Sequence, residues 1–141
     1  MKRKASATWN GDLKSGKGSI STESKTLSNA QYSFTTRFEN GVGTNPEELI
    51  AAAHSGCFSM ALSAQLGEAG MKPEKIETTA TVTLDKTEKG WTVTDILLEV
   101  KAKVPGADPA AFDTAAKAAK EGCPISRLLN TKIAMNVTLE K

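Results

Sequence analysis

The chain has 141 residues, of which 39% are hydrophobic and 24% charged, a composition typical of one globular domain with its own core. Its net charge of only +2 excludes the strongly basic surface on which nucleic-acid-binding proteins rely. The basic start Met1–Lys4 is not followed by an apolar segment, so the sequence predicts no signal peptide, no membrane-spanning segment and a cytoplasmic location.

Short strands are predicted in the N-terminal third, which is rich in Gly, Ser and Thr. Three segments have the composition of strands, namely residues 5–9, 18–22 and 32–36. The turn signal Asn10-Gly11-Asp12 separates the first two. These segments therefore predict a small sheet before the first helix.

The clearest helix is predicted to begin after Asn45 and to run to about Gly70. Asn45 can cap it, Pro46 suits its first position, and Glu48 at the third position completes a capping box. Its apolar side chains occur almost all round the helix. A helix without a polar face is normally buried by other elements or by a partner subunit.

A hairpin is predicted next, with its turn at residues 87–90. Residues 76–84 alternate between apolar and polar side chains, as expected for a half-exposed strand. In the return strand, residues 91–104, the apolar phase slips by one position at Asp95, which indicates a β-bulge.

The C-terminal part is predicted to contain two helices and a strand. Asp108 and Pro109 begin the first helix, which ends near Gly122, and a short helix over residues 124–130 precedes a strand over residues 133–139. Strands and helices without a strict βαβ rhythm favour an α+β fold. We expect residues 1–141 to form a single domain.

Two cysteines are the residues of this chain that stand out chemically. Cys57 lies in the apolar central helix, and Cys123 stands between Gly122 and Pro124, where a helix begins. In a reducing compartment such cysteines are either transiently redox-active or small buried side chains. The N–H groups at a helix start stabilise a thiolate, so position alone favours Cys123 as the nucleophile, unless it is a structural cap.

A carboxylate, an imidazole and the Cys57 thiol share one sector of the central helix. Glu47 and His54 lie about 20° apart around the helix axis, and Cys57 lies about 80° from Glu47. Because Glu48 is taken up by the cap, Glu47 is the carboxylate that needs a partner. The leading candidate is Arg37, which can bind a carboxylate with two nitrogens and can lower the pKa of a nearby thiol.

Each of these residues also has a simpler interpretation. Arg37 can be a solvated strand residue. His54 and Cys57, three positions apart on the helix, can form a thiol dyad, or His54 can be a hydrogen-bonded residue at the edge of the core. One histidine and two distant cysteines do not form a metal-ligand set.

Several motifs together resemble the OsmC branch of the OsmC/Ohr family, and they extend over essentially the whole chain. They are Trp9-Asn10-Gly11-Asp12, Thr36-Arg37-Phe38-Glu39, Gly43-Thr44-Asn45-Pro46-Glu47-Glu48-Leu49, Ala52-Ala53-His54, Cys57-Phe58-Ser59-Met60-Ala61-Leu62, Leu66-Gly67-Glu68-Ala69-Gly70 and Gly122-Cys123-Pro124-Ile125-Ser126.

The resemblance implies an intertwined α+β homodimer, in which antiparallel sheets pack around long central helices and two active sites lie at the subunit interface. It implies a cysteine-based peroxidase acting on organic hydroperoxides, without metal or other cofactor and without nucleic-acid or membrane partners. In this reading Cys57 is the peroxidatic thiol, Cys123 the resolving thiol, Arg37 the activating cation and Glu47 its carboxylate partner.

The chemistry implied is oxidation of Cys57 to a sulfenic acid, formation of a Cys57–Cys123 disulfide, and reduction by a small or protein-bound dithiol. The apolar side chains expected to contact the organic part of the peroxide are Phe34, Phe38, Phe58 and Met60. Two other functions remain open at this point: a thiol hydrolase using Cys57 and His54, and a non-catalytic redox sensor or binding dimer.

Overall fold

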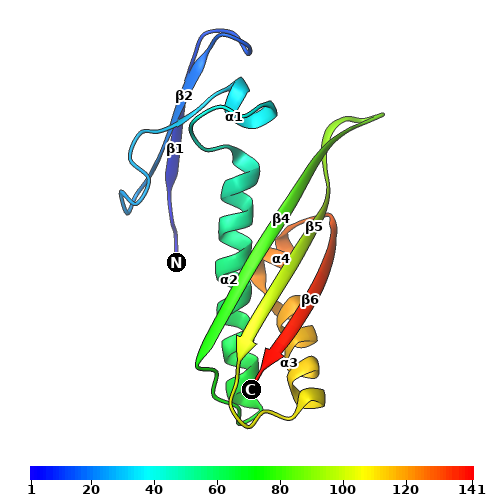
Figure 1. Ribbon diagram of the computed structural model, residues 1–141. Coiled ribbons are helices and arrows are strands. Elements are labelled where there is room, and N and C mark those ends of the chain that lie inside the picture. Colours follow the sequence, from blue (N-terminus) through cyan, green and yellow to red (C-terminus); the bar gives the residue numbers. More distant parts are fainter. The chain divides into compact units, whose positions relative to one another are not determined.

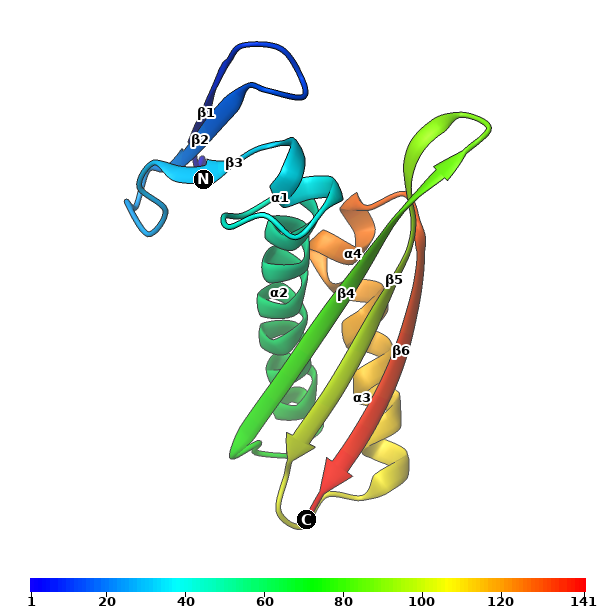
Figure 2. The same ribbon diagram turned by 45° about the horizontal axis from the view of Figure 1, so that its top comes forward.

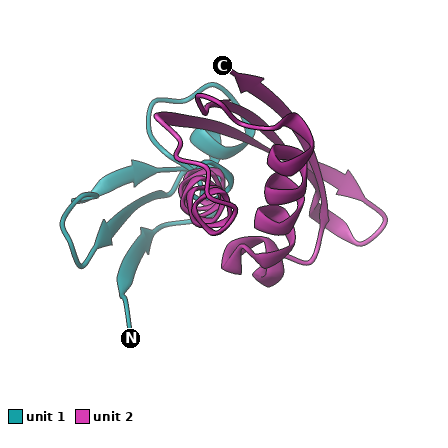
Figure 3. Cartoon of the chain, turned by 90° about the horizontal axis from the view of Figure 1, so that it is seen from below, with its two compact units in different colours: residues 1–49 teal, residues 50–141 magenta.

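The computed structural model describes residues 1–141 as two compact units, residues 1–49 and 50–141 (Figure 3). The division falls inside the long helix α2 (Pro46–Glu68), where the sequence pattern shows no break. The sequence predicts a single domain over the same residues. The two units are described in turn.

The first unit contains a three-stranded antiparallel sheet of β1 (Ala5–Asn10), β2 (Lys17–Thr22) and β3 (Ala30–Tyr32). The central strand pairs Gly18 with Trp9 on one side and Tyr32 on the other. The two rings meet over this glycine, with centroids 5.4 Å apart. A Cβ atom on Gly18 would lie 2.3 Å from the Tyr32 ring, so only glycine allows this contact.

A short helix, α1 (Phe34–Phe38), replaces most of the third strand that the sequence predicts, and only Tyr32 of residues 32–36 is in a strand. The reason is local. The Ser33 hydroxyl accepts a hydrogen bond from the Thr36 N–H at 3.3 Å, and the Thr36 hydroxyl accepts one from the Ser33 N–H at 2.8 Å. This reciprocal capping box begins a helix despite the β-propensity of the phenylalanine and threonine residues.

Helix α2 begins at Pro46, as predicted, because the Asn45 side chain accepts a hydrogen bond from the Glu48 N–H at 2.8 Å. The other half of the predicted capping box is replaced. The Glu48 carboxylate accepts a hydrogen bond from the Thr44 hydroxyl at 3.3 Å instead of binding the Asn45 backbone. The start of the helix is therefore fixed by side chains on both sides of the cap.

Helix α2 ends in a Schellman motif. The N–H of Gly70 donates to the carbonyl of Gly67, and the N–H of Met71 donates to the carbonyl of Leu66. Gly70 has a φ of +74°, which favours glycine. The helix therefore stops where the sequence predicts.

By length and apolar composition, α2 is also able to cross a membrane, which the sequence analysis did not expect. Soluble core helices have the same composition, and one side of α2 is buried within the chain. Only 22% of its most apolar window is buried, however, and Met60 is 77% exposed. One chain therefore leaves an apolar surface of α2 uncovered. The buried residues of α2 are His54, Phe58, Leu62 and Leu66.

The second unit contains a sheet in the order β4-β5-β6 (Figure 1). The predicted hairpin joins β4 (Lys75–Thr87) to β5 (Gly90–Lys103). The register shifts opposite Thr94, which gives the predicted β-bulge. The last strand, β6 (Lys132–Glu140), pairs with β5 in parallel, so the expectation of antiparallel sheets does not hold for this pair. The reason is the helical crossover between the two strands.

Two helices form that crossover. Helix α3 (Pro109–Gly122) is capped by the Asp108 carboxylate, which accepts a hydrogen bond from the Ala111 N–H at 2.9 Å. Helix α4 (Pro124–Leu128) follows after the single residue Cys123 and ends two residues earlier than predicted.

The core of the second unit lies between the helices and one face of the sheet (Figure 2). It joins side chains of α2, β5 and α3 at the point where α3 passes into α4. Cys123 is part of it and is fully buried. The larger buried side chains are Phe58, Leu62, Leu66, Ile96, Leu98, Val100, Val104 and Phe112.

Candidate active site

The second unit brings the two cysteines together. Cys57 lies on α2, Cys123 lies between α3 and α4, and their sulfur atoms are 3.1 Å apart although 66 residues separate them in the sequence. Both are free thiols. A disulfide bond of about 2.05 Å requires the sulfurs to approach by about 1 Å more, so a small movement of α4 or of the side chains is enough.

The surroundings of the two thiols shift their pKa values in opposite directions. The pKa of Cys57 is raised by burial and by the neighbouring Cys123, against the effect of the Ile125 N–H. Burial also opposes ionisation of Cys123. Its pKa is nevertheless lowered, because the Ser126 N–H, the Cys57 thiol, the Ser126 hydroxyl and the Ile125 N–H favour its thiolate. Within this unit alone Cys123 ionises first, as its position at a helix start indicates.

His54 does not form a dyad with Cys57. Its Nε2 atom lies 2.7 Å from the Ser126 hydroxyl oxygen, and its Nδ1 atom has no hydrogen-bond partner. The ring is fully buried, and burial lowers its pKa, which favours the neutral ring. Ser126 was not among the predicted site residues, and it stood out in the sequence only as the last residue of the motif Gly122-Cys123-Pro124-Ile125-Ser126.

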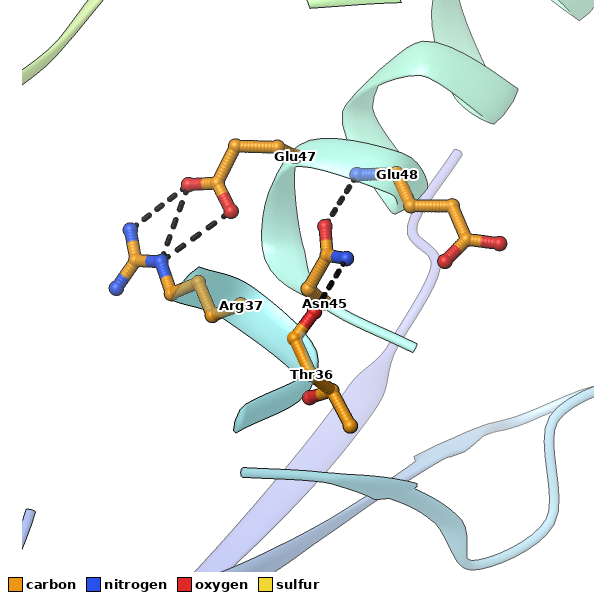
Figure 4. A network of polar contacts seen from close by, with 5 residues as sticks. All are labelled: Thr36, Arg37, Asn45, Glu47 and Glu48. Atoms are coloured by element: carbon orange, nitrogen blue, oxygen red, sulfur yellow. Dashed lines mark hydrogen bonds and ion pairs between the residues drawn. The ribbon is translucent and has the colours of Figure 1, made fainter. Parts of the chain in front are cut away.

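Arg37 and Glu47 form a close ion pair in the first unit (Figure 4). The Arg37 Nε lies 3.2 Å from both carboxylate oxygens, and Nη2 lies 2.8 Å from Oε1. The Asn45 amide holds the two helices together, since its Nδ2 donates to the Thr36 carbonyl at 3.0 Å. Glu47 therefore has the partner that the sequence analysis suggested, although Arg37 lies on a helix rather than a strand.

A pocket of about 290 Å³ lies beside this ion pair in the first unit. The Phe34 and Phe38 rings are 4.8 Å apart, and the Arg37 guanidinium lies 5.3 Å from the Phe38 ring centre. The pocket is thus lined by aromatic rings and by the positively charged guanidinium of Arg37. Its lining is Trp9, Leu13, Tyr32, Ser33, Phe34, Arg37, Phe38 and Pro46.

Two of the four predicted substrate contacts line this pocket, and one is buried elsewhere. Phe58 is fully buried in the core of the second unit, because it shares the sheet-facing side of α2 with Leu62 and Leu66 at helical spacing. Its ring is therefore not available to a substrate. Met60 is exposed on α2. Trp9, Leu13 and Tyr32 were missed, because no local pattern connects the first strands to Arg37.

Comparisons with known proteins add three findings. The model of a family described as "OsmC-like protein" matches residues 38–138. The chain is 51% identical over 138 residues to a protein named "Peroxiredoxin OsmC" from Escherichia coli, covering 98% of this chain and 96% of that protein. It is 32% identical over 100 residues to an "Organic hydroperoxide resistance protein" from Xanthomonas axonopodis pv. citri, covering 70% of this chain and 68% of that protein.

Solved structures show the same fold. An OsmC-like protein from Mycoplasma pneumoniae superimposes with a TM-score of 0.79 at 15% identity, covering 100% of this chain and 99% of that one. An organic hydroperoxide resistance protein, OhrB of Bacillus subtilis, gives a TM-score of 0.69 at 24% identity and covers 97% and 98% of the two chains. The α+β architecture is thus shared along the full length.

Proposed function

This chain belongs to the OsmC family, and we propose that it is a thiol peroxidase that reduces organic hydroperoxides to alcohols. The observation that carries the proposal is the 3.1 Å contact between Cys57 and Cys123. The names of the relatives, a peroxiredoxin and an organic hydroperoxide resistance protein, point to the same chemistry. The family match crosses the boundary between the two units, which supports a single functional domain over residues 1–141.

In the proposed reaction the Cys57 thiolate attacks the outer oxygen of the peroxide. The O–O bond breaks, the alkoxide takes up a proton and leaves as the alcohol, and Cys57 becomes a sulfenic acid. Cys123 then forms a disulfide with Cys57 and releases water. A small or protein-bound dithiol reduces this disulfide by exchange. Each step uses groups that the two thiols and their substrates supply, so no metal or organic cofactor is needed.

In this proposal, Cys57 rather than Cys123 attacks the peroxide only if a positive charge lies near Cys57. Within its own unit the pKa of Cys57 is raised, whereas a peroxidatic thiol needs a lowered pKa. The Arg37–Glu47 pair is the proposed source of the charge, because a full positive charge outweighs the partial charge at a helix start. Arg37 would then reverse the order in which the two thiols ionise.

We propose that this charge comes from a second copy of the chain. Cys57 follows Glu47 by ten residues on the same helix, which corresponds to a rise of about 15 Å. Along α2, Glu47 and Cys57 are thus separated by more than a Debye length at physiological ionic strength. We therefore propose a homodimer in which the Arg37–Glu47 pair of one copy lies beside Cys57 of the other. The uncovered apolar surface of α2 supports this.

The pocket beside Arg37 is the proposed site for the organic part of the substrate. Its aromatic lining favours a peroxide with a hydrocarbon group, which gains free energy when it leaves water. Hydrogen peroxide has no such group. The proposed enzyme therefore prefers organic hydroperoxides, and we place it in the cytoplasm, where dithiol reductants keep Cys57 and Cys123 reduced.

The test compares peroxide consumption by wild type, Cys57→Ser and Cys123→Ser with a dithiol as electron donor. We expect Cys57→Ser to be inactive and Cys123→Ser to accumulate a sulfenic acid. Intact mass measured without reductant, after one equivalent of cumene hydroperoxide, should show wild type with one disulfide within each chain. Undiminished turnover in Cys57→Ser would contradict the proposal, and a clean disulfide with negligible turnover would indicate a redox sensor instead.

A further inference from the structure

The two cysteines of the proposed reaction differ sharply in their exposure. Cys57 is partly exposed on α2, whereas Cys123, between α3 and α4, is fully buried. Their sulfur atoms are nevertheless only 3.1 Å apart. Solvent therefore reaches Cys57, while protein covers every direction of approach to Cys123.

Cys123 is also held in place by both of its neighbouring helices. Its N–H donates to the Ala119 carbonyl at 2.9 Å, and its carbonyl accepts a hydrogen bond from the Arg127 N–H at 3.0 Å. Its side chain belongs to the core of the second unit, together with Phe112 and Ala116 of α3. Exposing the Cys123 sulfur therefore requires part of α3 or α4 to leave its packing, which costs apolar burial.

We propose that the reducing thiol attacks the Cys57 sulfur of the disulfide, so that Cys123 is the thiol released. This inference rests on the proposed peroxidase function and assigns the atoms of its reductive half. A thiol that attacks one sulfur of a disulfide approaches in line with the bond that breaks, from the side opposite the other sulfur. For Cys123 that side lies within the core, whereas for Cys57 it is the side away from the buried thiol.

The atoms and electrons of this step balance with the dithiol as the only co-reactant. The thiolate of the reductant forms an S–S bond with Cys57, the Cys57–Cys123 bond breaks, and its electron pair leaves on the Cys123 sulfur, which takes up a proton. The second thiol of the reductant then attacks the reductant's own sulfur in the mixed disulfide and releases Cys57 as a thiolate. The protein gains two electrons, and the reductant becomes a disulfide.

One axis through the Cys57 sulfur then serves all three displacements of the proposed cycle. The peroxide oxygen meets Cys57 on its exposed side, and the hydroxyl of the sulfenic acid remains on that side. Cys123 displaces this hydroxyl from the buried side, starting from a distance of 3.1 Å that is typical of a near-attack arrangement. The reductant then displaces Cys123 from the exposed side. Cys57 therefore needs to be reached from one direction only.

Leaving-group ability by itself would favour the opposite assignment. If the Arg37–Glu47 pair lowers the pKa of Cys57, Cys57 becomes the better leaving group, and attack on Cys123 would release it. Access decides against this, since a sulfur that no thiol can reach is not attacked, however good its leaving group is. The positive charge that activates Cys57 also attracts the thiolate of the reductant toward the Cys57 sulfur.

The first experiment identifies the sulfur that the reductant attacks. The disulfide form, prepared with one equivalent of cumene hydroperoxide, is mixed with a large excess of cysteamine, quenched with acid at increasing times and alkylated with N-ethylmaleimide in urea. Lysine and arginine residues between the cysteines let trypsin place Cys57 and Cys123 on separate peptides. At the earliest times we expect cysteamine on the Cys57 peptide and maleimide on the Cys123 peptide, in at least about tenfold excess over the reverse pattern.

The second experiment measures access to each thiol by itself. Cys123→Ser keeps only Cys57 and Cys57→Ser keeps only Cys123, so the two variants are matched controls for each other. Each is treated with the small disulfide dithiodipyridine in the folded state and in urea, with circular dichroism to show that it is folded. We expect Cys123 to react at least about a hundredfold more slowly in the folded protein than in urea, because its reaction requires local opening. Cys57 should show a much smaller difference.

Two results would overturn the inference. One is at least as much cysteamine on the Cys123 peptide as on the Cys57 peptide. The other is a folded Cys57→Ser protein whose Cys123 reacts as fast as it does in urea, and this measurement decides alone if no mixed disulfide is captured. If wild type forms no disulfide after cumene hydroperoxide, the proposed function fails, and this outcome is recognised before cysteamine is added.

Discussion

The guanidinium of Arg37 contacts both carboxylate oxygens of Glu47, although the two residues lie on different helices. The Glu47 side chain is only 12% exposed and that of Arg37 is 39% exposed. Glu47 is thus the anchored partner, and none of these hydrogen bonds uses the Arg37 Nη1 atom (Figure 4). The pair presents a fixed positive group that remains able to bind an anion.

Replacing Arg37 is expected to raise the pKa of Cys57 and slow its reaction with peroxide. In Arg37→Ala we expect the rate at pH 7 to fall at least about tenfold, because each unit of pKa above the working pH lowers the thiolate fraction tenfold. Arg37→Lys should retain part of the rate. Alkylation of Cys57 against pH, in a Cys123→Ser background, measures the shift. The exposed residue Arg127 gives the control Arg127→Ala, and an alkylation curve of Arg37→Ala that superimposes on that control would rule out activation by Arg37.

A mixture of two inactive variants tests whether each site is built from two chains. Arg37→Ala supplies an intact Cys57, and Cys57→Ser supplies an intact Arg37. If equal amounts are unfolded and refolded together, a heterodimer regains one working site of its two, and about a quarter of the wild-type activity should return. Each variant refolded alone is the control. Absence of recovery, with mixed dimers shown by native mass spectrometry, would mean that Arg37 and Cys57 do not act across the dimer.

His54 should make the protein less stable in mild acid. Burial lowers its pKa below the ordinary value of 6.5, so between the folded and unfolded pKa values the unfolded chain binds more protons. Stability contributed by the neutral ring is therefore present above about pH 6.5 and is lost as the pH falls below it, by at most about 1.4 kcal/mol per pH unit. Urea unfolding of wild type and His54→Gln between pH 5 and 8 measures this. Parallel pH profiles for the two proteins would contradict the prediction.

The aromatic pocket is expected to set the preference for organic peroxides. Phe34→Ala removes one of the two rings that meet at 4.8 Å and should lower kcat/KM for cumene hydroperoxide about tenfold, the loss expected when one ring no longer contacts the substrate. The same variant should change the rate with hydrogen peroxide little. Val42→Ala, an exposed position that does not line the pocket, is the control. Equal losses for both peroxides would show that Phe34 supports the fold rather than the substrate.

Local signals in the sequence predicted most elements correctly. Asn45 and Asp108 mark the starts of α2 and α3, and the slip in apolar phase at Asp95 marks the bulge in β5. These features depend on residues a few positions apart, so a single sequence reveals them. The exception is α1, where Ser33 and Thr36 form a capping box that outweighs the strand-like composition around them.

The residues proposed to react could also be named from the sequence, since Cys57, Cys123, Arg37 and Glu47 occur in motifs that resemble one family. The contacts that surround these residues could not be predicted from the sequence. The contact of Cys57 with Cys123, the burial of Phe58 and the bond between His54 and Ser126 all depend on how α2 and α4 lie against the sheet and each other. Periodicity along a helix shows which residues share a face, but only packing between distant segments decides what that face meets.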